Sequence, residues 1–393
     1  MEFLSTLEDP RPRRSIPLRN ICIGAFIIVS SRLGSINALM TRTKGRTWKQ
    51  YCAPGPLPSA DQLGRIAARL PSRAIRRQIK KVYGGLKRGK ALAPAGHDNL
   101  FSLVIDGHEF CSSYLRDCDS CLTRQIKTKQ GERTQYYHRL VMGVLVCDRF
   151  TLLLDAEMQR KGEDEVAAAT RLLERLLRDY PRAFDLVLAD GLYARAPFFK
   201  MIRKAGKHAI AVLKSPKRDL YGDVMGLCKQ LPARNLNTSA VRRKVWDIET
   251  LNSWPSMGTS VRVVRSVETT RVKRQLSGKI ETVINNWMWV TTIPKALLAT
   301  TEFIDVAHHR WNIENDAFNE LATYWHSSHV YKHDPDAMLV FWLLTMLAYN
   351  IFHAFYFLNI KPALRSQLPK YQAAELITAE FVLQQLTPRQ RAP

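Results

Sequence analysis

Two aspartates each end a short apolar run and each precede a glycine. Asp106 closes the run LVID, and Asp190 closes LVLAD. For one such aspartate alone, a turn residue is the more common explanation. Two of them are informative together, because carboxylates at the carboxyl ends of neighbouring strands would converge at one edge of a sheet. The pair therefore marks a candidate site.

Glu314 is the candidate third carboxylate. It lies in TTEFIDVAHHRWNIENDAFNELATYW, where Thr301 can cap a long helix and Arg310 precedes Glu314 by one turn on the same face. Clustered carboxylates repel each other, and their hard oxygen ligands suit Mg²⁺ or Mn²⁺. Two such ions stabilise the attacking and leaving oxygens of a phosphoryl displacement. The set therefore predicts phosphoryl-transfer chemistry that depends on a pair of metal ions.

The charge of the chain favours a polyanionic partner. Its 393 residues, enough for two or three structural units, carry 59 Lys and Arg against 35 Asp and Glu, a formal net charge of +24. Basic side chains gain affinity by releasing counterions from phosphates, so DNA or RNA is the leading candidate. The alternative is a basic surface that is only solvated.

Residues 1–95 are predicted to form a basic helical region that binds DNA. Between Arg65 and Lys90 there are ten basic residues and no acidic one, and apolar residues recur at helical spacing. Ser59 is the expected N-cap of one helix, which breaks at Pro71. The apolar face of such a helix can pack against the rest of the protein while the basic face binds phosphate. The alternative is a basic face that is only exposed to solvent. The candidate DNA contacts in this region are Arg65, Arg69, Arg76, Arg77 and Lys80.

The order of the predicted elements indicates an α/β fold. Three strands, over 101–107, 136–147 and 150–157, precede a helix over 163–181 and then a strand, a helix and a strand. This pattern predicts a partly parallel sheet beneath helices. Strand-like runs after residue 214 predict a mostly β insertion. The predicted segments are 1–95, 96–214, 215–298, 299–365 and a C-terminal tail at 366–393.

Two features bear on the compartment in which the chain works. Residues 337–360 carry no formal charge and are long enough to cross a bilayer. Asn350, His353 and Asn359 interrupt this run, so we expect a helix buried in the core and no membrane partner. Seven cysteines without a secreted disulfide spacing, and an N-terminus unlike a signal peptide, predict a cytoplasmic location.

A second constellation, H-x2-C-x6-C-x2-C, follows the first strand. His108, Cys111, Cys118 and Cys121 supply four soft or borderline ligands at a spacing that can enclose a structural zinc ion. His108 is also explained by its closeness to Asp106. The sequence favours a set of free thiols in a reducing cell, and zinc is the alternative.

Trp287 and Trp289 share one face of a predicted strand in NNWMWV. Aromatic rings can stack on a displaced or flipped nucleotide. The pattern favours a packing role in the core of the inserted sheet.

The residues above resemble a known family. The order of Asp106, Asp190, a β-rich segment and then Arg310-x3-Glu314 is similar to that of the DDE transposases of bacterial insertion sequences, most closely the insertion sequence 4 family and its relatives. Longer phrases, among them VLADGLYARAPFF and RWNIENDAFNEL, resemble transposase sequences. The resemblance implies a ribonuclease H-like catalytic core that the β insertion interrupts, with an N-terminal helical region and C-terminal helices.

The resemblance also implies a role for each residue. Asp106, Asp190 and Glu314 would be catalytic and would bind two Mg²⁺ or Mn²⁺ ions, and Arg310 would contact a phosphate near the cut. Water would be activated to nick the DNA at the element's end, and the freed 3′-hydroxyl would then attack target DNA. The expected partners are the terminal inverted repeats of the element, target DNA and a second copy of the chain, because transposition brings two ends together.

The chain departs from the family's Tyr-x2-Arg-x3-Glu-x6-Lys pattern at two positions. Ala307 stands at the Tyr position and Leu321 at the Lys position, which removes two expected DNA contacts. The candidate substitutes are His329 and Lys332, and the spare acids that compete for the third catalytic role are Glu109, Asp155 and Glu157. The predicted function is DNA cleavage and strand transfer. Two rivals are a metal-dependent nuclease without strand transfer and a DNA-binding relative that has lost catalysis.

Overall fold

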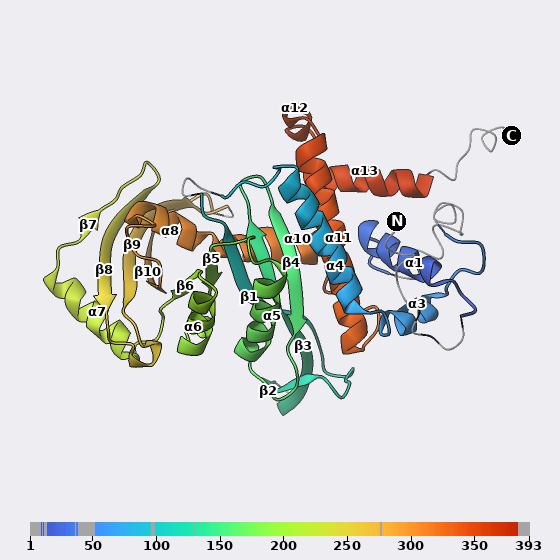
Figure 1. Ribbon diagram of the computed structural model, residues 1–393, viewed down its shortest axis with the longest axis horizontal. Coiled ribbons are helices and arrows are strands. Elements are labelled where there is room, and N and C mark those ends of the chain that lie inside the picture. Colours follow the sequence, from blue (N-terminus) through green and yellow to red (C-terminus); the bar gives the residue numbers. More distant parts are fainter. Residues whose placement is uncertain are drawn as a thin grey trace.

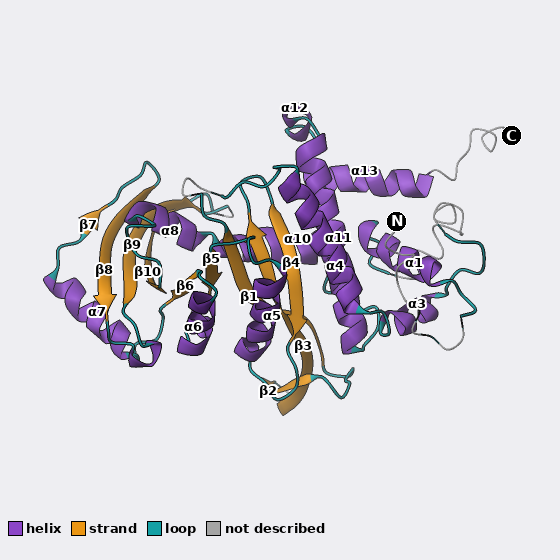
Figure 2. Ribbon diagram, viewed as in Figure 1, coloured by secondary structure: helices purple, strands orange, loops and turns teal. Residues whose placement is uncertain are grey.

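The computed structural model describes residues 9, 11, 14–35, 37, 52–95, 99–129, 131–275 and 277–383. Parts of the predicted segment 1–95, and the end of the predicted tail, lie outside these residues. The strands are β1 (Ser102–Ser113), β2 (Leu122–Thr128), β3 (Gly131–Val146), β4 (Thr151–Met158), β5 (Leu186–Ala189), β6 (His208–Val212), β7 (Arg234–Asn235), β8 (Val241–Leu251), β9 (Val261–Lys273) and β10 (Ile280–Thr291). Helices lie on both sides of these strands (Figure 2).

The ten strands form one mixed sheet in the order β2-β3-β1-β5-β6-β10-β9-β8-β7, with β4 paired to the other part of β3. β1 is antiparallel to β3 and parallel to β5, and β5 is parallel to β6. The α/β class and the partly parallel sheet are thus confirmed. β2 was not predicted, because its residues are mostly exposed and polar.

The segment predicted as a β insertion continues the same sheet. β10 pairs antiparallel with β6, and β9, β8 and β7 follow outward from it (Figure 1). This segment also contains a helix, α7 (Asp219–Gln230), which the sequence did not predict.

Two groups of helices cover the two faces of the sheet. The face that includes Leu103, Ile105 and Ala189 packs against α5 (Glu165–Asp179), α6 (Ala196–Lys204) and α7. The other face includes Val104 and Leu188, which belong to the same core cluster as residues of several further helices. These are α1 (Leu18–Ser30), α3 (Ala60–Ala67), α4 (Ser72–Arg88), α8 (Thr300–His308), α10 (Asn319–Tyr324) and α11 (Pro335–Asn359). The shorter or peripheral elements are η3 (Gly191–Tyr193), η4 (Pro255–Met257), α9 (Arg310–Asn312), η5 (Ile313–Phe318), α12 (Pro362–Arg365) and α13 (Lys370–Leu383).

Among the described residues, α11 is the one helix long and apolar enough to cross a membrane. Of its most apolar stretch of 18 residues, 72% is buried inside the protein. Its polar residues have partners there. The Asn350 side chain donates to Leu153 O at 2.8 Å and accepts from Leu153 N at 2.9 Å. His353 Nε2 lies 2.8 Å from Glu320 Oε1. The burial and these contacts agree with the expected core helix.

Two of the N-terminal helices, α3 and α4, begin where the sequence predicts, whereas no start was predicted for α1. Ser59 caps α3 through a capping box with Gln62, and α4 starts at Ser72 after the break at Pro71. Ile75 and Ile79 are buried on the inner face of α4, which lies beside α11 (Figure 1).

Candidate functional site

Asp106 and Asp190 lie side by side where the parallel pairing of β1 with β5 ends. Ile105 of β1 pairs with Ala189 of β5, so the two aspartates occupy the next position on each chain. Side chains alternate between the two faces of a strand. Val104 and Leu188 belong to the core cluster on the α11 face, and Asp106 and Asp190 therefore point to that same face.

Arg310 joins two of the three candidate carboxylates. Its Nη1 atom donates to Asp106 Oδ2 and to Glu314 Oε1, each at 3.0 Å. The two carboxylates therefore lie no more than twice that distance apart. The Arg310 side chain is only 8% exposed, and its Nε has no hydrogen-bond partner among the described residues. The structure thus links Asp106 and Glu314 through one arginine, and places Asp190 on the strand beside Asp106.

The segment that carries Glu314 is not the single long helix that we expected. It divides into α8, α9, the π-helical η5 and α10, and Glu314 lies in η5. The expected cap at Thr301 is wrong, because the helix begins at Thr300 and has no side-chain cap. Thr300 instead donates to Asp247 Oδ2 at 2.6 Å. A π-helical turn inside an α-helix is rare and is frequent at functional sites.

The two aspartates have opposite electrostatic environments. Burial raises the pKa of Asp106 to about 7, and the charges of Glu165 and Glu314 add to this, although Arg310 and the Gly107 N–H act against it. Burial would also raise the pKa of Asp190, but hydrogen bonds from Lys214 and the Gly191 N–H outweigh it and lower that pKa. Lys214 Nζ lies 2.8 Å from Asp190 Oδ1. A cation therefore contacts each aspartate, but it outweighs burial only at Asp190.

Two charged residues of this site, Lys214 and Glu165, were not predicted from the sequence. Lys214 follows β6 as Asp190 follows β5, so the end of the run HAIAVLK carried a signal for it. Glu165, at the start of α5, is packed so closely over Gly107 that a Cβ there would lie 2.3 Å from its carboxyl group. Tyr193 donates to Glu165 Oε1 at 2.6 Å, and Arg139 lies 2.7 Å from Glu165 Oε2. No local pattern signals Glu165, because its closeness to β1 is tertiary.

The three spare acids are paired with arginines. Glu109 forms two hydrogen bonds of 2.8 Å with Arg124. Asp155 accepts from Arg76 and Arg175, and Glu157 accepts from Arg171 and Arg175. Each of them lies in an ion pair instead of facing Arg310.

The two departures from the family pattern lie in the core. Ala307 is 4% exposed and Leu321 is 0% exposed, so neither position can contact DNA. The candidate substitutes His329 and Lys332 are both exposed, in the segment that precedes α11.

The candidate zinc ligands are only partly brought together. Cys118 and Cys121 lie within reach of each other, but their partners are His138 and His333. His108 is not in this group, because its ring stacks on Phe318 at 4.5 Å between ring centroids. Burial lowers the pKa of His108 to about 4, so it is neutral. Cys111 pairs with His138 across β1 and β3 but is also outside the group.

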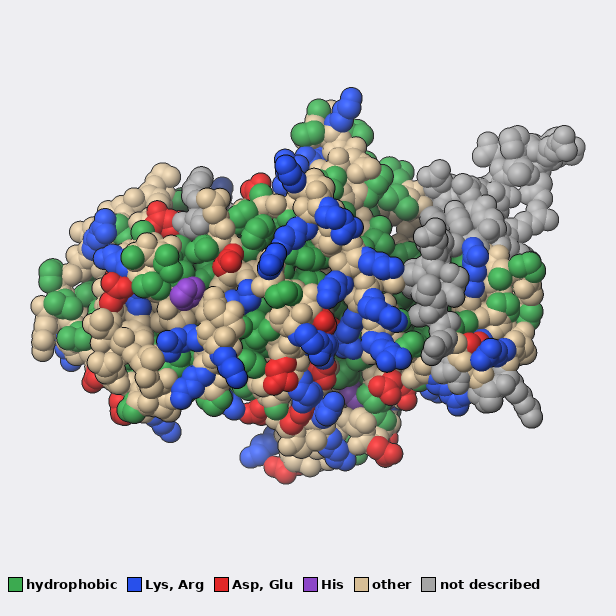
Figure 3. Space-filling model, in the orientation of Figure 1, with side chains coloured by type: hydrophobic (Ala, Val, Ile, Leu, Met, Phe, Trp, Pro, Cys, Tyr) green, Lys and Arg blue, Asp and Glu red, His purple; other side chains and the backbone are tan. Residues whose placement is uncertain are grey.

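Four of the five predicted DNA-binding residues of the N-terminal region line a groove, and the fifth, Arg65, lies outside it. Arg69, Arg76, Arg77 and Lys80 line a groove of about 840 Å³ between α4 and α5. Arg76 is engaged there by Asp155 and by Ala156 O, whereas Arg69, Arg77 and Lys80 are exposed, as is Arg73 beside them. Figure 3 shows Lys and Arg side chains gathered along α4. Arg65 is outside this groove, in an exposed ion pair of 2.8 Å with Asp61.

The tryptophan pair is mainly a packing feature. The Trp287 and Trp289 rings stack with centroids 5.8 Å apart, and Trp289 is buried against Phe303. Trp287 also contacts Trp311, which is 40% exposed and directly follows Arg310.

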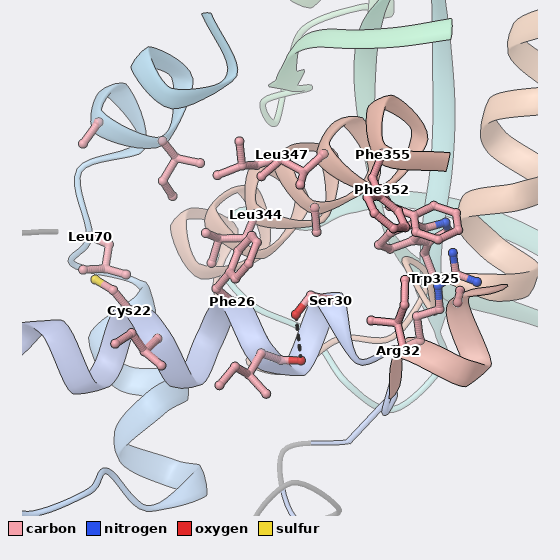
Figure 4. A pocket seen from close by; sticks show the side chains of 18 of the residues that line it. Cys22, Phe26, Ser30, Arg32, Leu70, Trp325, Leu344, Leu347, Phe352 and Phe355 are labelled. Atoms are coloured by element: carbon pink, nitrogen blue, oxygen red, sulfur yellow. Dashed lines mark hydrogen bonds between the residues drawn. The ribbon is translucent and has the colours of Figure 1, made fainter. Parts of the chain in front are cut away.

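A second hollow, of about 470 Å³, lies between α1 and α11 (Figure 4). Phe26, Leu344 and Phe355 are among its apolar lining residues, and Ser30 donates to Ile27 O. Its described lining residues include no carboxylate and no histidine. This hollow therefore offers nothing for metal-dependent chemistry.

The donor atoms of the carboxylate site suit divalent metal ions. Asp106, Asp190 and Glu314 offer only oxygen ligands, and Arg310 and Lys214 now supply the positive charge that those carboxylates need. Such a site on an α/β fold is typical of phosphoryl-transfer enzymes.

Comparison with protein families agrees with this class. Residues 108–351 match the family described as "Transposase DDE domain", and the chain belongs to that family. The match includes Asp190 and Glu314 and begins two residues after Asp106. No match was found among curated proteins.

Proposed function

We propose that this protein is a DNA transposase that cleaves DNA at the ends of a mobile element and joins those ends to target DNA. The observation that carries the proposal is that Asp106 and Glu314 both accept hydrogen bonds from Arg310, and that Asp190 follows the adjacent strand. Membership of the DDE family supports it. A closer affinity to the insertion sequence 4 family rests on sequence resemblance alone.

The strand order supports a ribonuclease H-like core. β4, β3 and β1 form an antiparallel group, and β5 and β6 then continue from β1 in parallel. Within this core, Asp106, Asp190 and Glu314 would hold two Mg²⁺ or Mn²⁺ ions. When bound, these ions would supply Lewis-acid chemistry to the scissile phosphate and to the attacking water.

The residues of the chain have separate tasks in this proposal. Asp106 must lose its proton before it can bind a cation, and its raised pKa makes this step depend on pH near neutrality. Arg310 would also contact a phosphate oxygen, because Nη1 alone makes its contacts to the two carboxylates and its Nε has no hydrogen-bond partner among the described residues. The exposed basic side chains on α4 would bind the DNA backbone, and two copies of the chain would hold two ends in the cytoplasm.

The joining step separates this proposal from a plain nuclease. The purified chain is incubated with Mn²⁺, a supercoiled target and a pre-cut DNA end, taken from the inverted repeats beside its coding sequence, that carries a free 3′-hydroxyl. We expect labelled end covalently joined to target. The same end with a 3′-dideoxy terminus is the control and should not join. Cleavage without joining would instead identify a nuclease, and DNA binding without either would identify a catalytically inactive relative.

A further inference from the structure

Four side chains that the carboxylate site does not use have the composition of a zinc site. Cys118 and Cys121 lie between β1 and β2, His138 lies on β3, and His333 precedes α11. Their ligand atoms all lie within 4.8 Å of one another. Two thiols and two imidazoles are a common ligand set of tetrahedral structural zinc.

Four of the six distances between these atoms are close to the edges of a zinc tetrahedron. Cys118 Sγ and Cys121 Sγ are 3.7 Å apart, and His138 Nε2 lies 3.4 Å from the first and 3.3 Å from the second. His333 Nε2 lies 3.3 Å from Cys121 Sγ. Zinc bond lengths imply edges of about 3.8 Å between two sulfurs and about 3.6 Å between sulfur and nitrogen. We propose that Cys118, Cys121, His138 and His333 bind one structural Zn²⁺ ion.

The backbone around the cysteines holds their two sulfur atoms close together. Cys121 N donates to Cys118 O at 3.0 Å, which closes a tight turn over the two residues between them. Cys118 N donates to Cys121 Sγ at 3.3 Å. The turn and this hydrogen bond therefore fix both sulfur atoms on the same side of the loop, where one ion can reach them.

The two imidazoles argue against a simple thiol or disulfide pair. A disulfide between Cys118 and Cys121 would need no other ligand, yet Nε2 atoms from two separate segments face Cys121 Sγ. Cys121 is 2% exposed and His138 is 1% exposed, so solvent has little access to either side chain. A metal ion gives all four atoms a partner at once.

The bound ion would join distant parts of the chain near the carboxylate site. β1 carries Asp106 and is paired with β3, and His333 lies just before the Asp334 cap of α11. The ion would therefore fasten the strand pair that bears Asp106 to the segment that follows the Glu314 helix. We expect its removal to lower the melting temperature of the whole chain.

The test uses the full-length chain, purified under reducing conditions from zinc-supplemented cells, with metal content measured by mass spectrometry. We expect about one zinc per chain, and after replacement by Co²⁺ a visible absorption band of tetrahedral cobalt with thiolate ligands. These wild-type measurements test whether the chain binds zinc even if the variants fold poorly. Zinc far below one per chain, together with no thiolate-cobalt band, would overturn the proposal, and so would a Cys118–Cys121 disulfide in the reduced preparation.

Matched variants assign the ligands. His333→Asn should weaken zinc binding at least about tenfold in competition with a chelator, whereas His329→Asn, in the same segment, should not. Cys118→Ser should do the same, and Cys111→Ser, on the neighbouring strand, should keep the metal. Asp106→Asn should also keep it, which separates this ion from those of the carboxylate site. Retention of zinc by His333→Asn, or its loss in Cys111→Ser, would contradict the assigned ligand set.

Discussion

Asp106 is the residue whose protonation the fold controls most directly within the carboxylate site. Its folded pKa, raised to about 7 chiefly by burial, lies above the ordinary value of 3.8. The protonated form is therefore the one that stabilises the metal-free fold. That contribution is complete below the ordinary pKa and is lost as the pH rises through about 7.

A divalent cation competes with this proton. We predict that Mn²⁺ raises the melting temperature more at about pH 8 than at about pH 6, because the carboxylate is already ionised at the higher pH. Asp106→Asn should lose most of the metal effect and its pH dependence. Thermal melts with increasing Mn²⁺ at both pH values measure this. A metal effect of the same size at both would show that Asp106 does not control metal binding.

Arg310 offers a second prediction at this scale. Arg310→Gln leaves Asp106 and Glu314 facing each other without their shared cation, and should reduce metal-free stability by about 3 kcal/mol. Mn²⁺ should restore much of that loss, because it supplies the missing charge. The control is Arg124→Gln, which breaks an ion pair that is 40% and 26% exposed and should cost less than about 1 kcal/mol. Chemical denaturation of both variants, with and without Mn²⁺, tests the difference; a loss in Arg310→Gln that Mn²⁺ leaves unchanged would count against a metal site here.

At the scale of elements, Glu320 connects three helices. It lies on α10, its Oε1 contacts His353 of α11, and its Oε2 lies 2.5 Å from Lys370 of α13. Burial would raise the pKa of Glu320, but these two partners outweigh it and lower the pKa to about 2. The ionised form therefore stabilises the fold above the ordinary value of 4.5, and this contribution is lost as the pH falls towards about 2.

We predict that Glu320→Gln loses about 3 kcal/mol of stability at neutral pH, and that its deficit relative to wild type shrinks as the pH falls from about 4.5 to about 2. Glu375→Gln, at an exposed position on α13, should change stability by less than about 0.5 kcal/mol. Urea denaturation across this pH range gives both values. A deficit that stays constant down to the lowest pH would mean that the charge of Glu320 is not what holds the helices.

The elements also show how much of the site can be predicted from short stretches of sequence. Apolar runs that close at Asp106 and Asp190, and an arginine one turn before Glu314, are local patterns in the sequence. In the structure β5 ends just before Asp190, whereas β1 continues past Asp106 to Ser113 and only its parallel pairing with β5 stops at Ile105. The π-helical turn at Glu314 has no local signal in the sequence, and η5 contacts β1, which is about 200 residues away along the chain. The same limit applies to the zinc ligands: His138 and His333 lie 17 and 212 residues from Cys121. Spacing within one strand therefore suggested His108 and Cys111 in their place.

At the scale of the whole molecule, the net charge of +24 is concentrated in part along α4 (Figure 3). We predict that replacing both Arg73 and Arg77 with alanine weakens DNA binding and lowers the slope of its salt dependence by about 2, since each arginine meets about one phosphate. Both side chains are exposed, so the melting temperature should change little.

The matched control removes the same charge elsewhere. Lys229 and Arg234 are exposed on α7 and β7, beyond the opposite end of the sheet from α4 (Figure 1). Alanine at both positions should leave the salt slope closer to that of the wild type. Fluorescence anisotropy over a range of salt concentrations compares the two double variants. An equal loss in both would mean that net charge, and not the α4 surface, determines affinity.

The central claim is that Asp106, Asp190 and Glu314 act together in metal-dependent DNA cleavage. The most direct measurement is cleavage of labelled DNA carrying the inverted repeats beside the coding sequence, with Mg²⁺ or Mn²⁺. Wild type is compared with Asp106→Asn, Asp190→Asn and Glu314→Gln, and DNA binding is measured in parallel. We predict that wild type cuts at the element end while all three variants bind the DNA and do not cut. Binding without cutting by wild type, or cutting by Glu314→Gln, would contradict the claim.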